Sequence, residues 1–257
     1  MLLAIDAGNT NVVFAVFDQN RKVGSWRIST DHNRTSDEYA VWLTHLMALV
    51  QLRPLDITDA ILASVVPAAN FHLQRLVRDH FRCEPLVIGA PGVKLGIEVV
   101  MDNPEEVGAD RLVNAIAARE RYQVPLIVID FGTATTFDVV DRDGNYCGGV
   151  IAPGINLSLE ALFMAAAKLP KVEIEEPKRV IGKGTIGAMK SGIFYGYVGL
   201  IEGLVTRIKA EYGEPMTVIA TGGLAGLFAR ATNMIDHTDA ELTLRGLRFI
   251  FEHNKAS

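Results

Sequence analysis

Apolar positions at the start of the chain form two short runs that are separated by a polar break. Residues 2–5 and 12–17 are almost entirely apolar, and Asp6-Ala7-Gly8-Asn9-Thr10 lies between them. This pattern predicts a strand, a tight turn and a second strand. Gly8 lets the backbone approach a bulky ligand, and N–H groups in such a turn can form an anion-binding concavity. A carboxylate beside phosphate-seeking donors makes sense if a cation lies between them; an ordinary hairpin with a polar tip is the alternative.

The same pattern occurs a second time, 124 positions later. Residues 126–144 read LIVIDFGTATTFDVVDRDG and align with the first stretch without a gap. In this alignment Asp130 falls on Asp6, and Gly132 falls on Gly8. An internal repeat that spans half of the chain predicts two homologous halves, each beginning with a hairpin whose tip carries Asp-x-Gly.

Helical and strand patterns alternate after each hairpin. Ser36 is expected to cap the first helix, because Asp37 and Glu38 follow it at the positive helix end. The helices are expected at 37–51, 70–81, 109–122, 155–167, 188–212 and 240–252, and further strands at 22–29, 59–66, 84–88, 97–101, 146–151 and 216–221. The fold class is therefore α/β, with mixed sheets flanked by helices. We expect domains at residues 1–115 and 116–257.

Composition and charge narrow the classes of function. The chain is 49% hydrophobic and 21% charged, which is ordinary for a globular protein. A net charge of −5 without a Lys/Arg cluster argues against nucleic acid but not against a small anionic substrate. Cys83 and Cys147 form no CxxC pair, so neither a disulfide framework nor a zinc site is expected. The sequence has no signal-peptide pattern and no apolar run long enough to cross a membrane, which predicts a cytoplasmic protein.

Asp110 is the candidate general base. It lies near the start of the helix that is predicted to follow Gly108. A base that removes a hydroxyl proton must point into a cleft, and a helix start between two lobes can provide that. An aspartate at this position can instead cap the helix, and a carboxylate held by backbone N–H groups is a weaker base. The adjacent Arg111 is either a surface ion-pair partner or a substrate-binding residue.

Glycines in the second half suggest close approaches to the backbone. Residues 182–187 satisfy GxGxxG, but they follow a loop and not a strand, so a dinucleotide site is not expected. Thr185 in this segment is either a helix N-cap or a substrate contact. Gly222 and Gly223 follow a predicted strand and would let a flat or anionic group approach the backbone.

A stripe of glycines runs along the longest predicted helix. Each glycine weakens a helix unless another element packs closely against it. Close packing is therefore expected on this stripe, either within the half or across a dimer. The stripe consists of Gly192, Gly196, Gly199 and Gly203.

Four motifs carry a resemblance to a known family. DAGNTN at 6–11, GADR at 108–111, DFGTA at 130–134 and TGG at 221–223 occur in the order and spacing of type III pantothenate kinases. The resemblance covers residues 2 to about 251, and the paired hairpins resemble the phosphate loops of the acetate and sugar kinase–Hsp70–actin superfamily. It implies two duplicated ribonuclease-H-like halves with an interlobe cleft. It also implies transfer of the γ-phosphoryl group of ATP to pantothenate, the first step of coenzyme A biosynthesis.

The resemblance also implies roles for individual residues. Asp110 is the expected catalytic base, Asp6 would organise Mg²⁺ through the phosphates, and Asp130 would hold a monovalent cation, K⁺ or NH4⁺. The expected ATP-binding residues are Asp6, Ala7, Gly8, Asn9, Thr10, Asn11, Val12, Val13, Thr133, Gly222 and Gly223. The expected substrate-binding residues are Met101, Gly108, Ala109, Asp110, Arg111 and Thr185.

One position departs from the family pattern. The family often has a tyrosine where this chain has Met101, which can pack against the substrate but cannot offer a phenolic hydrogen bond. The family also suggests a homodimer. Two other functions are kept as alternatives: a nucleotide-driven ATPase of the same superfamily, acting as a chaperone or filament protein, and a non-catalytic regulator that retains the fold.

Overall fold

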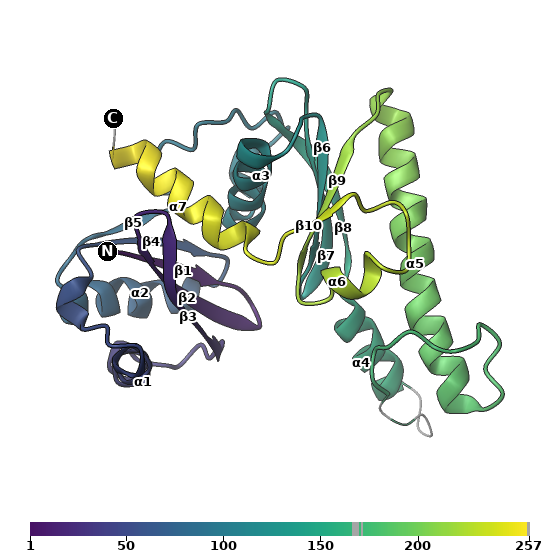
Figure 1. The fold of residues 1–257 in the computed structure, drawn as a ribbon, viewed down its shortest axis with the longest axis horizontal. Helices are drawn as coiled ribbons and strands as arrows, with labels where there is room; N and C mark the ends of the chain where they lie inside the picture. Colours follow the sequence, from purple (N-terminus) through teal and green to yellow (C-terminus); the bar gives the residue numbers. More distant parts are fainter. Residues whose placement is uncertain (166–169, 171, 256–257) are drawn as a thin grey trace. The chain divides into compact units, whose positions relative to one another are not determined.

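The computed structural model describes the chain except for residues 166–169, 171 and 256–257 (Figure 1). The chain forms two compact units. The first contains Met1–Glu98, Asp102–Glu120 and Glu241–Ser257, and the second contains Val99–Met101 and Arg121–Ala240. This division differs from two consecutive halves at 1–115 and 116–257, because the last helix and the residues up to Glu120 belong to the first unit.

The first unit is built on a five-stranded mixed sheet in the order β3-β2-β1-β4-β5. β1, β2 and β3 are antiparallel neighbours, whereas β1, β4 and β5 run parallel. The strands are β1 (Leu2–Ala7), β2 (Asn11–Asp18), β3 (Arg21–Ser29), β4 (Asp59–Ser64) and β5 (Pro85–Val87). The hairpin, the third strand and the two parallel strands therefore occur in the order that the sequence predicts.

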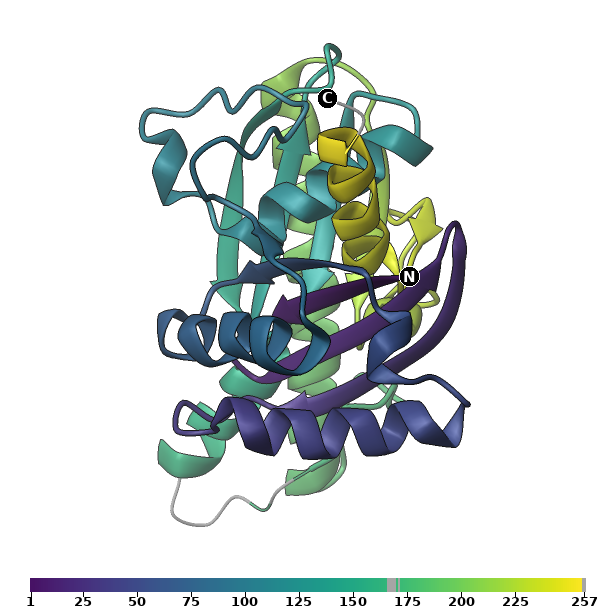
Figure 2. The ribbon, with the colours of Figure 1, turned by 90° about the vertical axis from the view of Figure 1, so that its left-hand side faces the viewer.

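Helices cover both faces of this sheet (Figure 2). One apolar core joins α1 and α2 to side chains such as Leu3, Ile5 and Phe14. The opposite core joins α3 and α7 to Leu2 and Ala4. The helices of this unit are α1 (Ser36–Leu49), α2 (Pro67–Leu76), α3 (Ala109–Arg121) and α7 (Leu242–Lys255), with one-turn segments η1 (Pro54–Asp56), η2 (Val77–Phe81) and η3 (Pro104–Glu106).

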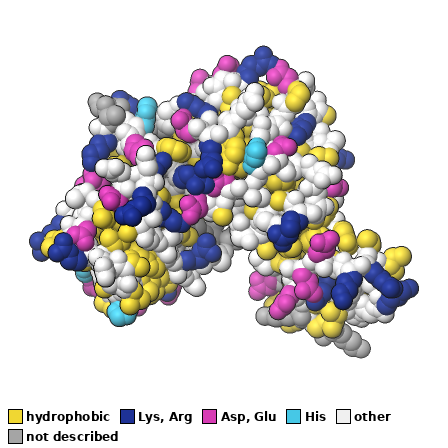
Figure 3. Space-filling model, viewed as in Figure 1, with side chains coloured by type: hydrophobic (Ala, Val, Ile, Leu, Met, Phe, Trp, Pro, Cys, Tyr) yellow, Lys and Arg dark blue, Asp and Glu magenta, His cyan; other side chains and the backbone are white. Residues whose placement is uncertain are grey.

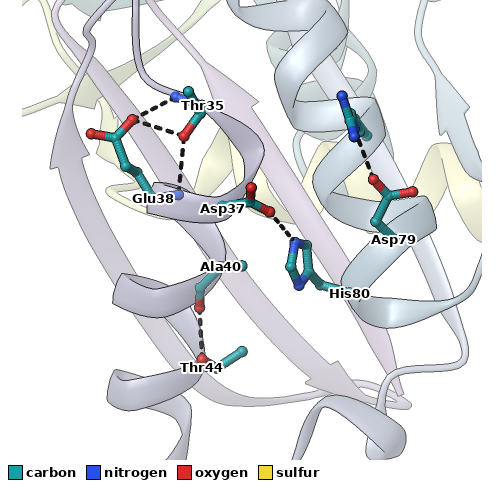
Figure 4. A network of polar contacts seen from close by, with 8 residues as sticks. Thr35, Asp37, Glu38, Ala40, Thr44, Asp79 and His80 are labelled. Atoms are coloured by element: carbon teal, nitrogen blue, oxygen red, sulfur yellow. Dashed lines mark hydrogen bonds and ion pairs between the residues drawn. The ribbon is translucent and has the colours of Figure 1, made fainter.

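The cap of α1 differs from the sequence expectation. Thr35 is the N-cap, and Ser36 is the first helical residue. The Thr35 hydroxyl accepts the Glu38 N–H at 3.3 Å, while the Glu38 carboxylate accepts the Thr35 N–H at 2.8 Å (Figure 4). This reciprocal capping box satisfies two helix-end donors, which a single Ser36 cap would not do.

The side of α1 away from the sheet is partly apolar. Val41 and Leu49 are 73% and 70% exposed, whereas Leu43 and Met47 are buried against the sheet. Figure 3 shows hydrophobic side chains gathered at the lower left, around α1. Within its unit, α1 is therefore held by its buried side chains, such as Leu43 and Met47, and not by its exposed apolar ones.

The second unit repeats the sheet in the order β10-β9-β6-β7-β8. β6, β7 and β8 are antiparallel neighbours, and β6, β9 and β10 run parallel. The strands are β6 (Leu126–Phe131), β7 (Ala134–Val140), β8 (Tyr146–Pro153), β9 (Thr217–Gly222) and β10 (His237–Thr238). Its order matches the first sheet strand for strand, so the predicted duplication of mixed α/β halves is confirmed.

Helices α4 (Ile155–Ala165), α5 (Thr185–Tyr212) and α6 (Ala225–Phe228) complete the second unit. Phe228 is fully buried, with its ring centroid 5.1 Å from that of Phe131 and 5.6 Å from that of Phe194. These stacked rings join α6, β6 and α5 in one core. Of the helix predicted at 155–167, residues 166 and 167 lie outside the described residues.

Two predicted elements differ in the structure. The strand expected at 97–101 is reduced to a single bridge between Val99 and Tyr146, because Pro104 and a polar turn follow closely. The helix expected at 70–81 begins at Pro67, whose fixed φ suits the first helical position, and it ends in the π-helical turn η2. Among the described residues, no helix is long and apolar enough to cross a membrane.

The contact between α3 and α7 leaves no room for a side chain at Gly246. A Cβ there would lie 2.3 Å from the Val113 carbonyl oxygen and 3.1 Å from the Ala117 Cβ. We expect Gly246→Ala to lower the free energy of unfolding by about 1–3 kcal/mol, despite the higher helix propensity of alanine. Urea denaturation would measure this change.

Gly226→Ala in α6 is the matched control. A Cβ at Gly226 would have its nearest neighbour, the Arg230 Nη1, at 3.9 Å, which is an ordinary contact. This variant should be as stable as the unmodified chain or more so. Equal stability of the two variants would contradict backbone-to-backbone packing of α3 and α7.

Candidate active site

The tip of the first hairpin is held by backbone hydrogen bonds and by one threonine. The Gly8 N–H donates to the Asn11 carbonyl at 3.0 Å. Thr30, at the end of β3, donates its hydroxyl to the Gly8 carbonyl at 2.6 Å and its N–H to the Thr10 carbonyl at 2.9 Å. Asn9 and Thr10 remain exposed. The tip is therefore fixed at its base and open to a ligand at its polar end.

Strand alternation decides where Asp6 points. Leu3, Ile5 and Ala7 are buried in the core beneath α1 and α2. Asp6 lies between Ile5 and Ala7, so its side chain points to the opposite face, on which α3 and α7 pack. The carboxylate is half-buried at the carboxyl-terminal end of a central strand.

The start of α3 lies at the same edge of the sheet. A Cβ at Gly108 would lie 2.7 Å from the Asp110 Oδ1 and 3.5 Å from the Val65 Cγ1. Val65 directly follows β4 and donates its N–H to the Ala7 carbonyl at 3.1 Å. The structure therefore brings Asp6 and Asp110 to one edge and one face of the first sheet.

Asp110 is a half-buried carboxylate in the first turn of α3. Its Oδ1 accepts the Arg111 N–H at 2.8 Å, so it also caps the first turn in part. Burial raises the pKa of Asp110, and the hydrogen bond and charge of Arg111 oppose this increase only in part. Capping thus does not turn this carboxylate into an unusually weak base.

The second hairpin is one residue shorter than the first. Ala7 pairs with Val12 across the first turn, which leaves residues 8–11 in the loop, but Phe131 pairs with Thr135 and leaves 132–134. The gapless alignment of the two stretches is therefore correct for the first strand of each hairpin and wrong by one residue for the second. Both second strands then show a register shift against the third strand at equivalent places.

Two glycines that are distant in sequence pack against this hairpin. The Gly154 N–H donates to the Thr133 carbonyl at 3.1 Å, and a Cβ at Gly154 would lie 2.2 Å from the same oxygen. Gly222 has a φ of +89°, and a Cβ there would lie 2.7 Å from the Asp130 Oδ1 and 2.6 Å from the Phe131 carbonyl oxygen. Gly223 has open space around it in the described part of the chain.

The surroundings of Asp130 fit a cation with oxygen ligands. The Asp130 Oδ1 and the Phe131 carbonyl oxygen both lie against the Gly222 backbone, so a side chain at position 222 has no room. Among the described residues, no group of three or more His, Cys, Asp or Glu side chains could hold a metal ion. A single carboxylate with carbonyl oxygens suits a monovalent ion, and a single carboxylate with ligand phosphates suits Mg²⁺ at Asp6.

The predicted site residues are divided between the two units. The first unit contains the predicted site residues in the ranges 6–13 and 108–111. The second unit contains the others, which are Met101, Asp130, Thr133, Thr185, Gly222 and Gly223. Ala7 and Val12 are buried in the core beneath α1 and α2, so only their backbone can serve a ligand.

The remaining substrate candidates, Thr185 and Met101, both lie in the second unit. Thr185 is exposed and is the first residue of α5, whose N-cap is Gly184, so the capping alternative for Thr185 is wrong. Met101 is 36% exposed, with its Sδ 3.5 Å from the place of a Cβ on Gly148.

Sequence reasoning missed two residues that shape the hairpin tips. The sequence patterns single out neither Thr30 nor Gly154. Thr30 follows a strand directly, and Gly154 follows the last residue of β8, so both lie one residue beyond the end of a third strand. A third strand ends beside the tip of its hairpin. The residue that directly follows each third strand is therefore a candidate contact of the tip that a sequence pattern can identify.

Comparisons with known proteins agree with this geometry. The family model described as "Type III pantothenate kinase" matches residues 2–207. A type III pantothenate kinase from Paramagnetospirillum magneticum is 66% identical over 254 residues, covering 99% of this chain and 98% of that protein. One from Rhodospirillum rubrum is 63% identical over 255 residues, covering 99% of both chains.

Solved structures with low sequence identity support the fold alone. The ethanolamine utilization protein EutJ from Carboxydothermus hydrogenoformans has a TM-score of 0.57 at 16% identity, covering 96% of this chain and 89% of that one. Component A of (R)-2-hydroxyglutaryl-CoA dehydratase from Acidaminococcus fermentans has a TM-score of 0.52 at 12% identity, covering 99% and 98%. Their similarity supports the fold of this chain, two duplicated ribonuclease-H-like sheets as are typical of the actin and Hsp70 fold.

Full-length identity above 60% to two kinases, together with the family match, decides between the functions left open by the sequence. The chain belongs to the type III pantothenate kinase family, and it phosphorylates pantothenate with ATP and Mg²⁺ in the first step of coenzyme A biosynthesis.

Proposed function

We propose that Asp110 accepts the proton of the primary hydroxyl of pantothenate as that oxygen attacks the γ-phosphorus of ATP. The bond from the γ-phosphorus to the bridging oxygen breaks, and ADP leaves with that oxygen. The observation that carries this proposal is the position of Asp110 at the sheet edge that also holds Asp6 and the first phosphate hairpin. A carboxylate whose pKa is raised by burial is a stronger base than an ordinary aspartate.

The first hairpin would hold the polyphosphate. Phosphoryl transfer depends on positioning and on charge neutralisation more than on covalent chemistry by the protein. Asp6 would meet the Mg²⁺ that accompanies the phosphates, and the exposed end of the hairpin at Asn9 and Thr10 would donate hydrogen bonds to phosphate oxygens. The attachment of this tip to Thr30 supports the role, because a fixed loop loses little entropy on binding.

The second unit would hold the monovalent cation and the nucleotide. Asp130 and the Phe131 carbonyl would bind K⁺ or NH4⁺, Thr133 would contact ATP, and Gly222 and Gly223 would pass close to the nucleotide. The support is the convergence of two oxygens on the backbone of Gly222.

Pantothenate recognition would fall mainly to Arg111, whose cation suits the substrate's carboxylate. Gly108 and Ala109 would present their backbone, and Met101 and Thr185 would complete the pocket. Met101 offers only packing, so its share of the affinity should come from contact area and not from a hydrogen bond.

The glycine stripe of α5 supports a homodimer. In the described part of the chain, no atom that could clash lies within 4 Å of a Cβ placed on Gly192, Gly196 or Gly199. Close packing within the unit therefore does not explain these glycines, which leaves packing against a second copy. We place the enzyme in the cytoplasm, where thiols such as Cys83 and Cys147 stay reduced.

Asp110→Asn separates catalysis from helix capping. If Asp110 is the base, the rate of phosphopantothenate formation should fall about 10²–10⁴-fold while ATP binding is retained. Isothermal titration calorimetry and a coupled assay would measure the two quantities. Asp102→Asn, at an exposed carboxylate near the start of α3, is the control and should retain turnover.

The raised pKa of Asp110 also predicts a stability effect with a definite sign. A carboxylate whose pKa is higher in the folded than in the unfolded chain stabilises the fold at low pH, and this stabilisation is lost as the pH rises through the folded-state pKa. Asp110→Asn should therefore melt at the same or a higher temperature at pH 7.5. Retained turnover together with a lower melting temperature would assign Asp110 to capping alone.

Gly222→Ala and Gly223→Ala test the cation site and the nucleotide turn separately. Alanine at position 222 would be strained at positive φ and would push against Asp130 and Phe131, so the half-saturating K⁺ concentration should rise about tenfold or more. Alanine at position 223 leaves Asp130 in place, so any effect should be confined to the KM for ATP. Identical K⁺ dependence of the two variants would contradict cation binding beside Gly222.

Gly196→Leu tests the dimer. A leucine on the glycine stripe should convert the dimer to a monomer at micromolar concentration, as measured by analytical ultracentrifugation. Glu211→Leu lies on the same helix about 90° away from the centre of the stripe and should leave the dimer intact. A monomeric unmodified chain, or a dimeric Gly196→Leu variant, would contradict the assignment of this face.

A further inference from the structure

One side-chain hydrogen bond at the first hairpin is additional to the backbone bonds that hold its tip. Thr30 directly follows β3, and its N–H donates to the Thr10 carbonyl at 2.9 Å. Its hydroxyl donates to a second carbonyl, that of Gly8, at 2.6 Å. Thr30 is half-buried, so this hydroxyl bond is partly shielded from water. The bond determines how one peptide group in the tip is oriented.

The Gly8 carbonyl and the Asn9 N–H belong to the same peptide group. In a planar trans peptide the C=O and N–H bonds point in opposite directions, so a contact that fixes one also fixes the other. The Gly8 carbonyl is turned toward Thr30, and the Asn9 N–H therefore points away from Thr30. Asn9 is exposed, and in the described part of the chain its N–H donates to no acceptor. This N–H is a donor that a ligand at the tip can use.

Gly8 by itself does not fix the orientation of this peptide group. Glycine has no Cβ and adopts a wide range of dihedral angles, so the peptide that follows it can turn over at little cost. A Cβ at Gly8 would have only the Asn11 carbonyl oxygen within 4 Å, at 3.4 Å, so crowding does not hold the peptide either. If the peptide turned over, the Gly8 oxygen would replace the Asn9 N–H, and its partial negative charge would repel a phosphate.

The second hairpin provides an internal comparison. Gly154 directly follows β8, as Thr30 follows β3, and its N–H donates to the Thr133 carbonyl at 3.1 Å. Gly154 has no hydroxyl, so the Gly132 carbonyl, which corresponds to that of Gly8, is not bound in this way. The backbone bond is therefore sufficient to join a third strand to the tip of its hairpin in this fold. The additional hydroxyl bond belongs to the hairpin for which we propose phosphate binding.

We propose that Thr30 is a positioning residue for ATP: its hydroxyl holds the Gly8–Asn9 peptide so that the Asn9 N–H, and not the Gly8 oxygen, faces the polyphosphate. The inference rests on the proposed phosphate binding by the first hairpin, and it names the side chain that sets which end of this peptide the phosphates meet. Thr30 itself contacts neither substrate in this scheme.

Thr30→Val tests the proposal because valine retains the branched shape and the backbone N–H but removes the hydroxyl. The KM for ATP should rise about threefold to tenfold, which corresponds to the loss of one hydrogen bond. The kcat and the KM for pantothenate should stay within about twofold. The inhibition constant of ADP should rise by a similar factor, whereas that of adenosine, which has no phosphates, should not change. A readout without turnover is the rise in melting temperature caused by Mg²⁺ and ADP, which should shrink in this variant.

Thr44→Val is the matched control. Thr44 is half-buried and donates its hydroxyl to the Ala40 carbonyl, also at 2.6 Å, but both residues lie in α1 and not in the hairpin (Figure 4). Its loss should leave the KM for ATP unchanged. Thr30→Ser retains a hydroxyl and should keep this KM within about twofold of the unmodified chain. Should Thr30→Val not fold, Thr30→Ala takes its place. A melting temperature that falls alike in Thr30→Val and Thr44→Val, with an unchanged KM for ATP, would overturn the inference.

Asp6→Asn distinguishes failure of the inference from failure of the phosphate site itself. If Asp6→Asn weakens inhibition by ADP but not by adenosine, and Thr30→Val weakens neither, the phosphate site stands and the role of Thr30 is refuted. If neither variant changes the inhibition constant of ADP, both are refuted.

Discussion

The arrangement of the site depends on one constraint, which is a carboxylate near the end of a strand that is covered on both faces. β1 and β6 are the central strands of their sheets, and nearly every residue in them is buried. Asp6 and Asp130 occupy the fifth position of each strand, just before the turn. The open edge of the sheet is where polar groups can surround such a charge, because the rest of the strand is apolar. Each hairpin therefore combines a rigid base with a charged rim.

The scaffold occurs twice in the chain, and local differences give each copy a hairpin tip with its own shape. The first turn has four residues between paired positions and the second has three, so the polar tips differ in shape although the strands before them are equivalent. Glycines complete the difference: Gly154 and Gly222 pack their backbone against the second tip, whereas a side chain from Thr30 holds the first. An identical strand order thus carries two turns of different shape, for which we propose phosphate binding in the first sheet and cation binding in the second.

The sequence predicted the strands and the paired hairpins because apolar runs and Asp-x-Gly turns are local signals. It placed Asp110 at the start of a helix for the same reason. It could not reveal the shorter second turn, since an alignment without gaps fits the first strands equally well. Nor could it show that Thr136 faces Asp130 across the hairpin, because that follows from pairing between strands. The contacts of Gly222 and Gly154 are also nonlocal: both involve backbone more than 20 residues away.

The three carboxylates differ in surroundings in a way that matches the tasks proposed for them. A proton acceptor benefits from a pKa that burial has raised, because a stronger base takes the proton more completely in the transition state. Asp110 has such an environment, with backbone donors as its main opposing influence. A cation ligand benefits instead from a stable negative charge with further oxygen atoms close to it. The Asp130 Oδ1 and the Phe131 carbonyl oxygen lie beside Gly222, and Thr136 pairs with Asp130 across the hairpin, whereas the apolar Val13 pairs with Asp6. The proposed division of proton transfer, cation binding and phosphate organisation among chemically identical aspartates therefore follows their environments more than their residue type.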